Sequence, residues 1–420
     1  MADSPIKRDF DVVIAGAGIA GATLALALES GGLKVALIDP QTFDAQLDAR
    51  FDGRASAISY AAFRQWRTLG LAPLLEPYAQ PIIRILVTDG RSPGASTRAP
   101  NPAWLHFDAL EIAETAGGEP LGYMLENRHI RASLVQALSV RPITVLSPAQ
   151  VTSFDQGEAG VRVRLLDGRA LDAGLLVGAD GRRSLVREQS GVGVQGWEYS
   201  QVAIVATVAL TGDHGGVAYE HFLPTGPFAI LPLTARRASL VWTEGTRRAA
   251  SLMGASDTLF AAHLARRFGE FVGRIEVEGP KFCYPLSLQL ADRLTAARVA
   301  LIGEAAHAVH PIAGQGLNMG LKDAAALAQV VTDAARLGED FGRADVLERY
   351  SRWRRLDNIG VAVATDAFTR LFSTDNMVVR LARDVGIAMV NSIGPTRRWL
   401  MAEAGGSVGD LPRLLRGQAL

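Results

Sequence analysis

The chain has 420 residues, with 43 basic and 43 acidic side chains and a formal net charge of zero. This length predicts two or three domains with a large buried core. The balanced charge argues against nucleic acid as the main partner. The single cysteine, Cys283, excludes an internal disulfide framework and any metal site built from several cysteines. Glycines interrupt the uncharged residues 12–28, and Asp9 and Asp11 precede them, so we expect a cytoplasmic protein without a signal peptide or membrane span.

The first 39 residues predict a βαβ unit. Residues 10–15 form an expected buried strand, a glycine turn opens a helix that continues to residue 28, and residues 34–39 form a second buried strand. Such units are parallel and right-handed in open α/β sheets.

The turn between the first strand and the helix carries a dinucleotide-binding pattern. Gly16, Gly18 and Gly21 fit G-x-G-x-x-G, in which the glycines allow a tight turn, the approach of a pyrophosphate and close helix packing. The helix N-terminus offers free N–H groups to the phosphates. Asp39, at the end of the second strand, is placed to accept hydrogen bonds from an adenosine ribose. This pattern does not distinguish NAD from FAD.

The rest of the chain predicts a second sheet and further helices. Strands are expected at 82–88, 161–166, 170–176, 202–210, 228–233, 238–243 and 299–302, and helices at 129–138, at 320–337 and beyond 340. Asp167-Gly168 is a strong hairpin signal between two of these strands. We therefore expect an α/β fold with a Rossmann-type nucleotide domain (1–75, 105–190 and 290–335), an inserted antiparallel sheet domain (76–104 and 191–289) and a helical C-terminal region (336–420).

Two later segments end buried strands with chemically suggestive turns. Asp180, in the Gly-Ala-Asp-Gly sequence, exposes a carboxylate at the carboxyl edge of a sheet, although an ordinary Asp-Gly turn explains it equally well. Residues 300–323 run from a strand through Gly303-Glu304 and a loop rich in glycine and proline into a helix. A glycine-rich loop before a helix can hold an anionic or electron-rich ring edge against backbone N–H groups.

Taken together, these motifs resemble those of a known family. GAGIAG with Asp39, GADGRRSLVR and GEAAHAVHPIAGQGLNMGLKD are similar to motifs of the class A flavin-dependent aromatic monooxygenases, of the para-hydroxybenzoate hydroxylase type. More narrowly, DGRASAIS (52–59), LGYMLENRHIRASL (121–134), PTGPFAILPL (224–233) and HPIAGQGLNMGLKD (310–323) resemble the ubiquinone-biosynthesis hydroxylases. The similarity runs from residue 10 to about residue 400.

The resemblance implies a bound FAD and assigns its contacts. The ADP half would be held by Gly16, Gly18, Gly21 and Asp39. The flavin, its pyrophosphate and the phosphates would be met by Arg54 and Arg131, and Asp180 is associated with both FAD and NAD(P)H. The isoalloxazine would be lined by Pro311, Gly314, Gln315, Gly316 and Asn318. Gly303 and Glu304 would lie at the ribityl chain, where the family usually has aspartate after the glycine.

The implied reaction is hydroxylation of the ring of a polyprenylated phenol, of the 2-polyprenyl-6-methoxyphenol hydroxylase type, in ubiquinone biosynthesis. NAD(P)H would reduce FAD, and a flavin C4a-hydroperoxide would attack the ring. The sequence offers no firm catalytic base, although His310 and Pro311 are expected near the flavin. The alternatives are a flavin-dependent reductase of a prenyl lipid, a hydroxylase of a small soluble aromatic acid, and a flavin-bearing assembly component without turnover.

Three further expectations concern metal, substrate and surroundings. Glu304, His307 and His310 form E-x-x-H-x-x-H, but a di-iron site needs a second Glu-x-x-His helix, so we expect no metal. An apolar substrate wall, or equally the core of a sheet, is expected from Tyr219, Phe222, Pro224, Phe228 and Trp242. Residues 377–393 predict a packed helix that could also dock on a membrane surface or on other enzymes of ubiquinone biosynthesis.

Overall fold

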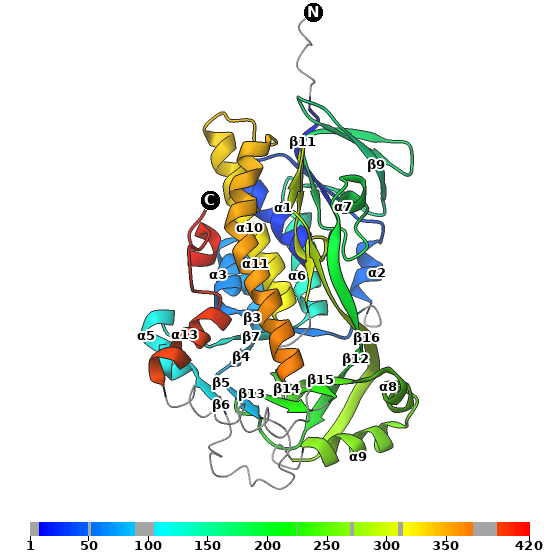
Figure 1. The fold of residues 1–420 in the computed structure, drawn as a ribbon, viewed down its shortest axis with the longest axis vertical. Coiled ribbons are helices and arrows are strands. Elements are labelled where there is room, and N and C mark those ends of the chain that lie inside the picture. Colours follow the sequence, from blue (N-terminus) through cyan, green and yellow to red (C-terminus); the bar gives the residue numbers. More distant parts are fainter. Residues whose placement is uncertain are drawn as a thin grey trace, which may run out of the picture.

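The computed structural model describes residues 8–48, 52–88, 105–223, 225–268, 273–309, 314–372 and 393–420. Two eight-stranded sheets and one three-stranded sheet form its framework. The first sheet lies behind the long helices in the upper part of Figure 1, and the second sheet lies below it, beside α8 and α9. The expected Rossmann-type α/β fold with a second, largely antiparallel sheet and C-terminal helices is confirmed.

The first sheet has a parallel centre. Its strands are β1 (Phe10–Ala15), β2 (Val35–Ile38), β8 (Thr144–Leu146), β9 (Val151–Gln156), β10 (Val161–Leu165), β11 (Ala170–Gly178), β17 (Thr295–Ala296) and β18 (Val299–Leu301). The order β18-β11-β1-β2-β8 is parallel throughout. From β1 the chain continues to β2 on one side, while β11 pairs on the other, which makes the carboxyl end of β1 a topological switch point. The expected hairpin at Asp167-Gly168 is confirmed by the antiparallel pairing of β10 with β11.

Helices cover the first sheet. They include α1 (Ile19–Ser30), α3 (Tyr60–Thr68), α6 (Asn127–Ser139), α10 (Gln315–Arg336) and α11 (Ala344–Phe372). Because α1 is apolar around its whole circumference, it is buried and packs against α10, which in turn packs against α11. The expected helix at 320–337 begins five residues earlier, at Gln315, directly after its N-cap residue Gly314, which has a left-handed conformation (φ +61°).

The second sheet is mostly antiparallel. Its strands are β5 (Arg84–Thr88), β6 (Leu105–Asp108), β12 (Val194–Leu210), β13 (Val217–Leu223), β14 (Gly226–Leu233), β15 (Arg237–Gly245), β16 (Ile275–Ala291) and β19 (His307–Ala308). Among the described strands of this sheet, β13 and β5 are the one pair that is parallel. A small third sheet contains β3 (Ala55–Ser59), β4 (Gln80–Ile82) and β7 (Gly122–Glu126). The expected strand at 82–88 is therefore divided between two sheets, and the boundaries of the two domains stay a prediction.

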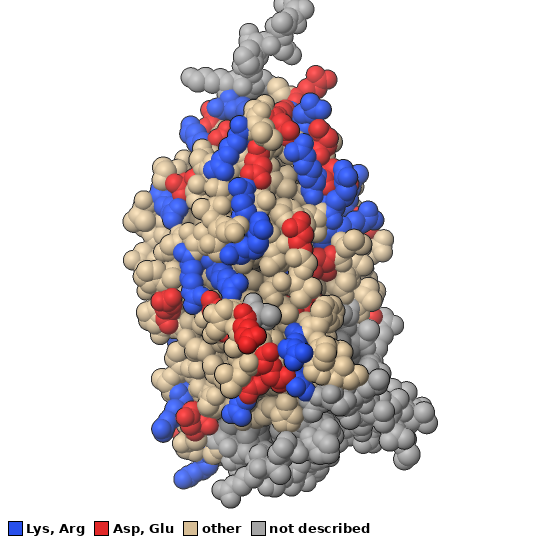
Figure 2. All heavy atoms as spheres, turned by 90° about the vertical axis from the view of Figure 1, so that its left-hand side faces the viewer, with Lys and Arg blue, Asp and Glu red and all other residues tan. Residues whose placement is uncertain are grey.

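The remaining helices are short or lie at the periphery. They are α2 (Phe43–Leu47), α4 (Ala72–Leu75), α5 (Ala113–Ala116), α7 (Leu185–Gln189), α8 (Thr246–Met253), α9 (Asp257–Phe268) and α13 (Gly394–Ala404). Within the part of the chain that the structure describes, no helix has both the length and the apolar content that crossing a membrane requires. Figure 2 shows the side that carries α13 and the C-terminus, where basic and acidic side chains lie among one another with broad uncharged areas between them.

Candidate functional site

The glycine turn after β1 is locked to its neighbours by close backbone contacts. Gly16 has φ +105°, and a Cβ there would overlap the carbonyl oxygen of Ala179 at the end of β11. A Cβ on Gly21 would overlap the carbonyl oxygen of Gly16. The first and third glycines are therefore required by the protein itself, as the motif predicts.

Gly18 differs from the other two glycines because it faces open space. It is the N-cap of α1, with φ −62° and ψ 174°, and no protein atom lies within 4 Å of a Cβ built on it. The free N–H groups at the start of α1 therefore border an open space at Gly18, the cradle, which any side chain at this position would occupy. A diphosphate is the kind of group that such a helix N-terminus holds.

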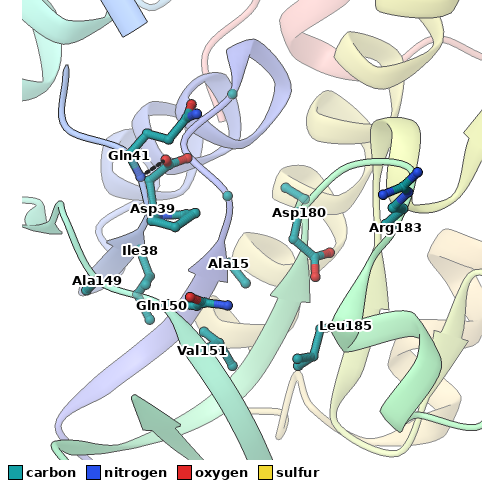
Figure 3. A pocket seen from close by; sticks show the side chains of 14 residues that line it. Ala15, Ile38, Asp39, Gln41, Ala149, Gln150, Val151, Asp180, Arg183 and Leu185 are labelled. Atoms are coloured by element: carbon teal, nitrogen blue, oxygen red, sulfur yellow. Dashed lines mark hydrogen bonds between the residues drawn. The ribbon is translucent and has the colours of Figure 1, made fainter. Parts of the chain in front are cut away.

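The Asp39 carboxylate closes the turn from the end of β2. Its Oδ2 accepts a hydrogen bond from the backbone N–H of Ala17 at 2.8 Å, and its Oδ1 accepts one from the N–H of Gln41 at 2.9 Å. The side chain is buried but lines a pocket of about 350 Å³ that opens at the switch point. Figure 3 shows Asp39 and Gln41 on one side of this pocket and Asp180 and Arg183 on the other.

The Asp180 carboxylate borders the same pocket but is also engaged within the protein. Its Oδ1 accepts a hydrogen bond from the Ser184 hydroxyl, and its Oδ2 accepts one from the N–H of Val186 at 3.1 Å. Asp180 thus stabilises the start of α7. From this helix Arg187 donates through Nη1 to the carbonyl oxygen of Ala305 at 2.9 Å, which ties the Asp-Gly turn to the Gly303-Glu304 segment.

Gly303 and Glu304 lie at the end of β18, beside α1 and α10. The N–H of Gly303 donates to Oδ2 of Asp323 on α10 at 3.1 Å, and a Cβ on Gly320 would lie 3.2 Å from the Cα of Gly303. Glu304 is half exposed, and its Oε2 lies 3.8 Å from Nε of Arg182. Its carboxylate is therefore available at the edge of the site.

The start of α10 is fixed to β3 by Asn318. The Asn318 amide donates to the carbonyl oxygen of Ala57 at 2.8 Å and accepts from the N–H of Ser59 at 3.0 Å. Asn318 is buried and its amide also donates to the carbonyl oxygen of Gly314, so its side chain fixes the position of Gly314 rather than pointing to solvent. Gln315 and Gly316 follow in the first turn of α10 and are partly exposed. His310 and Pro311 lie outside the described residues.

A cluster of charged side chains joins the entrance of β3 to α6. Both nitrogens of the Arg54 fork, Nε and Nη2, donate to the carboxylate of Asp52 at 2.9 Å, and Nη2 of Arg131 donates to it at 2.8 Å. Burial alone would raise the pKa of Asp52, but Arg54, Asn127 and Arg131 outweigh it and hold the pKa well below its usual range. The pKa of Arg54 lies above its usual value, mainly because of Asp52, and the negative charge of Glu304 contributes to this increase.

Sequence reasoning missed Asp52 and a second carboxylate, Asp323. Asp323 is fully buried and accepts hydrogen bonds from Nε2 of His307 at 2.5 Å and from Nε of Arg354 at 2.8 Å. Burial would raise its pKa, but the charges of His307 and Arg354 lower it well below the usual range. Asp52 and Asp323 both stand inside the quoted motifs, at the first residue of DGRASAIS and the last residue of HPIAGQGLNMGLKD, and this position is the signal that could have marked them.

The two described members of the E-x-x-H-x-x-H pattern face different partners. His307 is held by Asp323, whereas Glu304 is near Arg182. Among the described residues, no three His, Cys, Asp or Glu side chains are grouped so as to hold a metal ion.

Of the two alternatives that the sequence leaves open for the apolar residues of the second sheet, substrate wall or sheet core, the structure supports the sheet core for Phe228, Trp242 and Tyr219. Phe228 and Trp242 are fully buried and pack with Phe260 of α9 in the core of the second sheet, and Tyr219 packs against the same cluster. The sequence indicates apolar residues on one face of a strand but not which face a helix covers. Phe222 lies in a separate cluster with Val87 and Leu105, and Pro224 lies outside the described residues.

The comparisons with known proteins agree with this geometry. Residues 9–361 match the family model described as "FAD binding domain". The chain is 44% identical over 414 residues to ubiquinone hydroxylase UbiL of Rhodospirillum rubrum (98% of this chain, 93% of the relative) and 31% identical over 393 residues to the 3-demethoxyubiquinol 3-hydroxylase of Escherichia coli (92% and 96%). The crystal structure of p-nitrophenol 4-monooxygenase PnpA from Pseudomonas putida matches with a TM-score of 0.75 at 20% identity (94% and 97%) and shares the fold.

Fold and sequence thus define an FAD-dependent monooxygenase, an oxidoreductase. The chain belongs to the ubiquinone-biosynthesis hydroxylases within the FAD-binding-domain family. The residues present fit FAD, because the open cradle at Gly18 and the Asp39 carboxylate offer contacts for a diphosphate and a ribose.

Proposed function

We propose that this enzyme hydroxylates the aromatic ring of a polyprenylated phenol in ubiquinone biosynthesis, with NAD(P)H and dioxygen as co-substrates. The observation that carries the proposal is that the glycine turn, Asp39 and Asp180 line one pocket at the switch point of the parallel sheet, and that Arg187 ties the Asp180 turn to the segment that follows Gly303-Glu304. Relatives that match nearly the whole chain are named ubiquinone hydroxylases, which supports the substrate class.

The residues of this chain would bind and orient the cofactor. Gly18 and the start of α1 would receive the diphosphate, Asp39 would hold the ribose, and Arg54 and Arg131 would add positive charge. The N-terminus of α10, at Gly314, would stabilise negative charge at the ring edge of the flavin. When bound, FAD supplies the electron transfer and the activation of dioxygen, while the protein orients the phenol and excludes water.

The second sheet would supply the wall opposite the cofactor. Tyr284 on β16 donates from its hydroxyl to Oδ1 of Asp52 at 3.3 Å, and Phe282 on the same face packs where a Cβ on Gly53 would lie. This face is the one turned toward Arg54, since the guanidinium lies 5.1 Å from the centre of the Tyr284 ring. We therefore expect the phenol between the flavin and this face, away from Trp242.

A lipid substrate also favours contact with a membrane surface or with other enzymes of the pathway, and we propose peripheral association of a cytoplasmic protein. Leu356, Ile359 and Val363 are exposed along one side of α11, and Trp399 of α13 is exposed as well. Exposed apolar side chains of this kind support such association. Residues 377–392 of the segment expected to dock lie outside the described residues.

Disruption of the gene tests the proposed function. The proposal expects accumulation of a polyprenylated phenol that lacks one ring hydroxyl, and mass spectrometry identifies the missing position. A reductase of a prenyl lipid would instead leave an intermediate with an unreduced double bond, and purified enzyme would consume no oxygen. A hydroxylase of a small aromatic acid would leave ubiquinone levels unchanged.

A further inference from the structure

Asp52 gathers polar groups from separate parts of the chain around one buried carboxylate. We propose that Asp52 is a positioning residue that fixes Arg54 and Arg131 in the orientation in which they meet FAD, and that Tyr284 links this arrangement to the second sheet. The inference rests on the cofactor site of the proposed function. It assigns a role to a residue that does not itself touch the cofactor.

The hydrogen bonds show why Asp52 acts through its neighbours. Its Oδ1 accepts from the N–H and Nε of Arg54, both at 2.9 Å, and from the Tyr284 hydroxyl at 3.3 Å. Its Oδ2 accepts from Nη2 of Arg54 at 2.9 Å, from Nδ2 of Asn127 at 3.1 Å and from Nη2 of Arg131 at 2.8 Å. Each oxygen therefore already has three donors, and its side chain is only 3% exposed. A carboxylate so fully engaged would also repel an anionic ligand.

The two arginines need such a partner because their like charges repel. Arg131 is mostly buried, with 11% of its side chain exposed, whereas 43% of the Arg54 side chain is exposed. A carboxylate between two guanidinium groups adds two attractive ion pairs that offset their mutual repulsion, and the three groups together carry one net positive charge. The fork geometry with Arg54 also removes the rotational freedom of a long side chain before any ligand arrives.

Tyr284 adds a contact from the second sheet. The guanidinium of Arg54 lies 5.1 Å from the centre of the Tyr284 ring, within the range of a cation–π interaction. Tyr284 and Phe282 stand two residues apart on β16 and stack with an interplanar angle of 12°. The face that we expect to meet the substrate therefore touches Asp52 and Arg54 directly.

A competing explanation makes the opposite prediction for one substitution. If Arg54 and Arg131 acted only as positive charges, Asp52→Asn would raise the local charge and tighten the binding of anionic FAD. If Asp52 positions them, the same substitution releases the Arg54 fork and weakens binding. The sign of the change in Kd distinguishes the two explanations.

The experiment titrates the full-length apoprotein with FAD and follows flavin fluorescence. We expect Asp52→Asn to raise the Kd at least tenfold and to alter the visible absorption spectrum of the bound flavin. The matched control is Asp172→Asn, because Asp172 holds Arg162 in the same fork, at 2.8 Å and 2.8 Å, on the exposed surface. The control should stay within twofold of the wild type. An unchanged or lower Kd for Asp52→Asn would overturn the inference.

Tyr284→Phe keeps the test decisive if Asp52→Asn does not fold. This variant removes only the hydroxyl that donates to Asp52. We expect a Kd two- to fivefold above that of the wild type with an unchanged melting temperature of the apoprotein, and an unchanged Kd would overturn the link to the second sheet. Different results would contradict the two proposals. Wild-type protein that binds FAD but hydroxylates no phenol would contradict the proposed function alone. Normal FAD binding by both variants contradicts only the role of Asp52.

Discussion

Substitution of Gly18 separates what the fold needs from what the cofactor needs. At Gly18→Ala the backbone, with φ −62° and ψ 174°, suits alanine, and the new methyl group meets no protein atom within 4 Å. Alanine is a poorer N-cap than glycine, but it also restricts the unfolded chain, so the two effects oppose each other and the free energy of unfolding of the apoprotein should fall by no more than about 1 kcal/mol. The methyl group would, however, stand in the cradle expected for the diphosphate. Loss of one hydrogen bond to a charged group, about 1.5–3 kcal/mol, corresponds to a Kd for FAD about 10- to 150-fold higher.

Gly16→Ala is the matched contrast within the same turn. Here φ is +105° and the added Cβ overlaps the backbone of Ala179. A strained backbone of this kind costs about 1–3 kcal/mol before the overlap is counted, so the apoprotein itself should be destabilised. Urea unfolding of the two apoproteins and fluorescence titration with FAD measure both effects. Binding of FAD by Gly18→Ala as tight as in the wild type, or unchanged stability of Gly16→Ala, would refute the reasoning.

Three further predictions concern groups away from the glycine turn. Asp323→Asn removes the buried carboxylate that accepts from Nε of Arg354 and Nε2 of His307, leaving Asp357 as the carboxylate partner of Arg354, and should lower the free energy of unfolding by about 3–5 kcal/mol; a loss below 1 kcal/mol in urea would contradict this. Burial lowers the pKa of His221 to about 4, so as the pH falls the unfolded chain binds a proton before the folded protein does. The free energy of unfolding should therefore decrease by up to about 3 kcal/mol between pH 6.5 and pH 4. His221→Phe should make the free energy of unfolding depend less on pH in this range. Trp242→Ala should lower the free energy of unfolding by about 3–5 kcal/mol yet leave the KM for the phenol unchanged, because the side chain packs against Phe260 of α9; a raised KM would place Trp242 in the substrate wall.

The nucleotide turn was predictable because its requirements are local. Gly16, Gly18 and Gly21 lie within six residues, and Asp39 follows at the end of the next parallel strand. The spacing of the glycines and the apolar strands around them therefore carry nearly all the information. The start of α10 was less predictable, because Asn318 and Gly314 depend on contacts with β3 about 260 residues earlier in the chain.

The second sheet shows what a strand pattern leaves open. The sequence predicts strands at 228–233 and 238–243 with apolar residues, and in the structure Phe228 and Trp242 lie directly opposite each other on β14 and β15. Which face of the second sheet is turned toward the cofactor site depends on where α8 and α9 pack. The sequences of the strands do not indicate on which face these helices pack. The Asp52 cluster was hidden for the same reason: its partners Arg131 and Tyr284 lie 79 and 232 residues away in the sequence.

The most direct test of the hydroxylase is the fate of dioxygen. Purified enzyme loaded with FAD is supplied with NAD(P)H, a short-chain prenylated phenol and ¹⁸O₂, and the product is analysed by mass spectrometry. The proposed function predicts a ring-hydroxylated product with one ¹⁸O atom and consumption of dioxygen that depends on the phenol. A product labelled only from H₂¹⁸O, or turnover that proceeds without dioxygen, would contradict it.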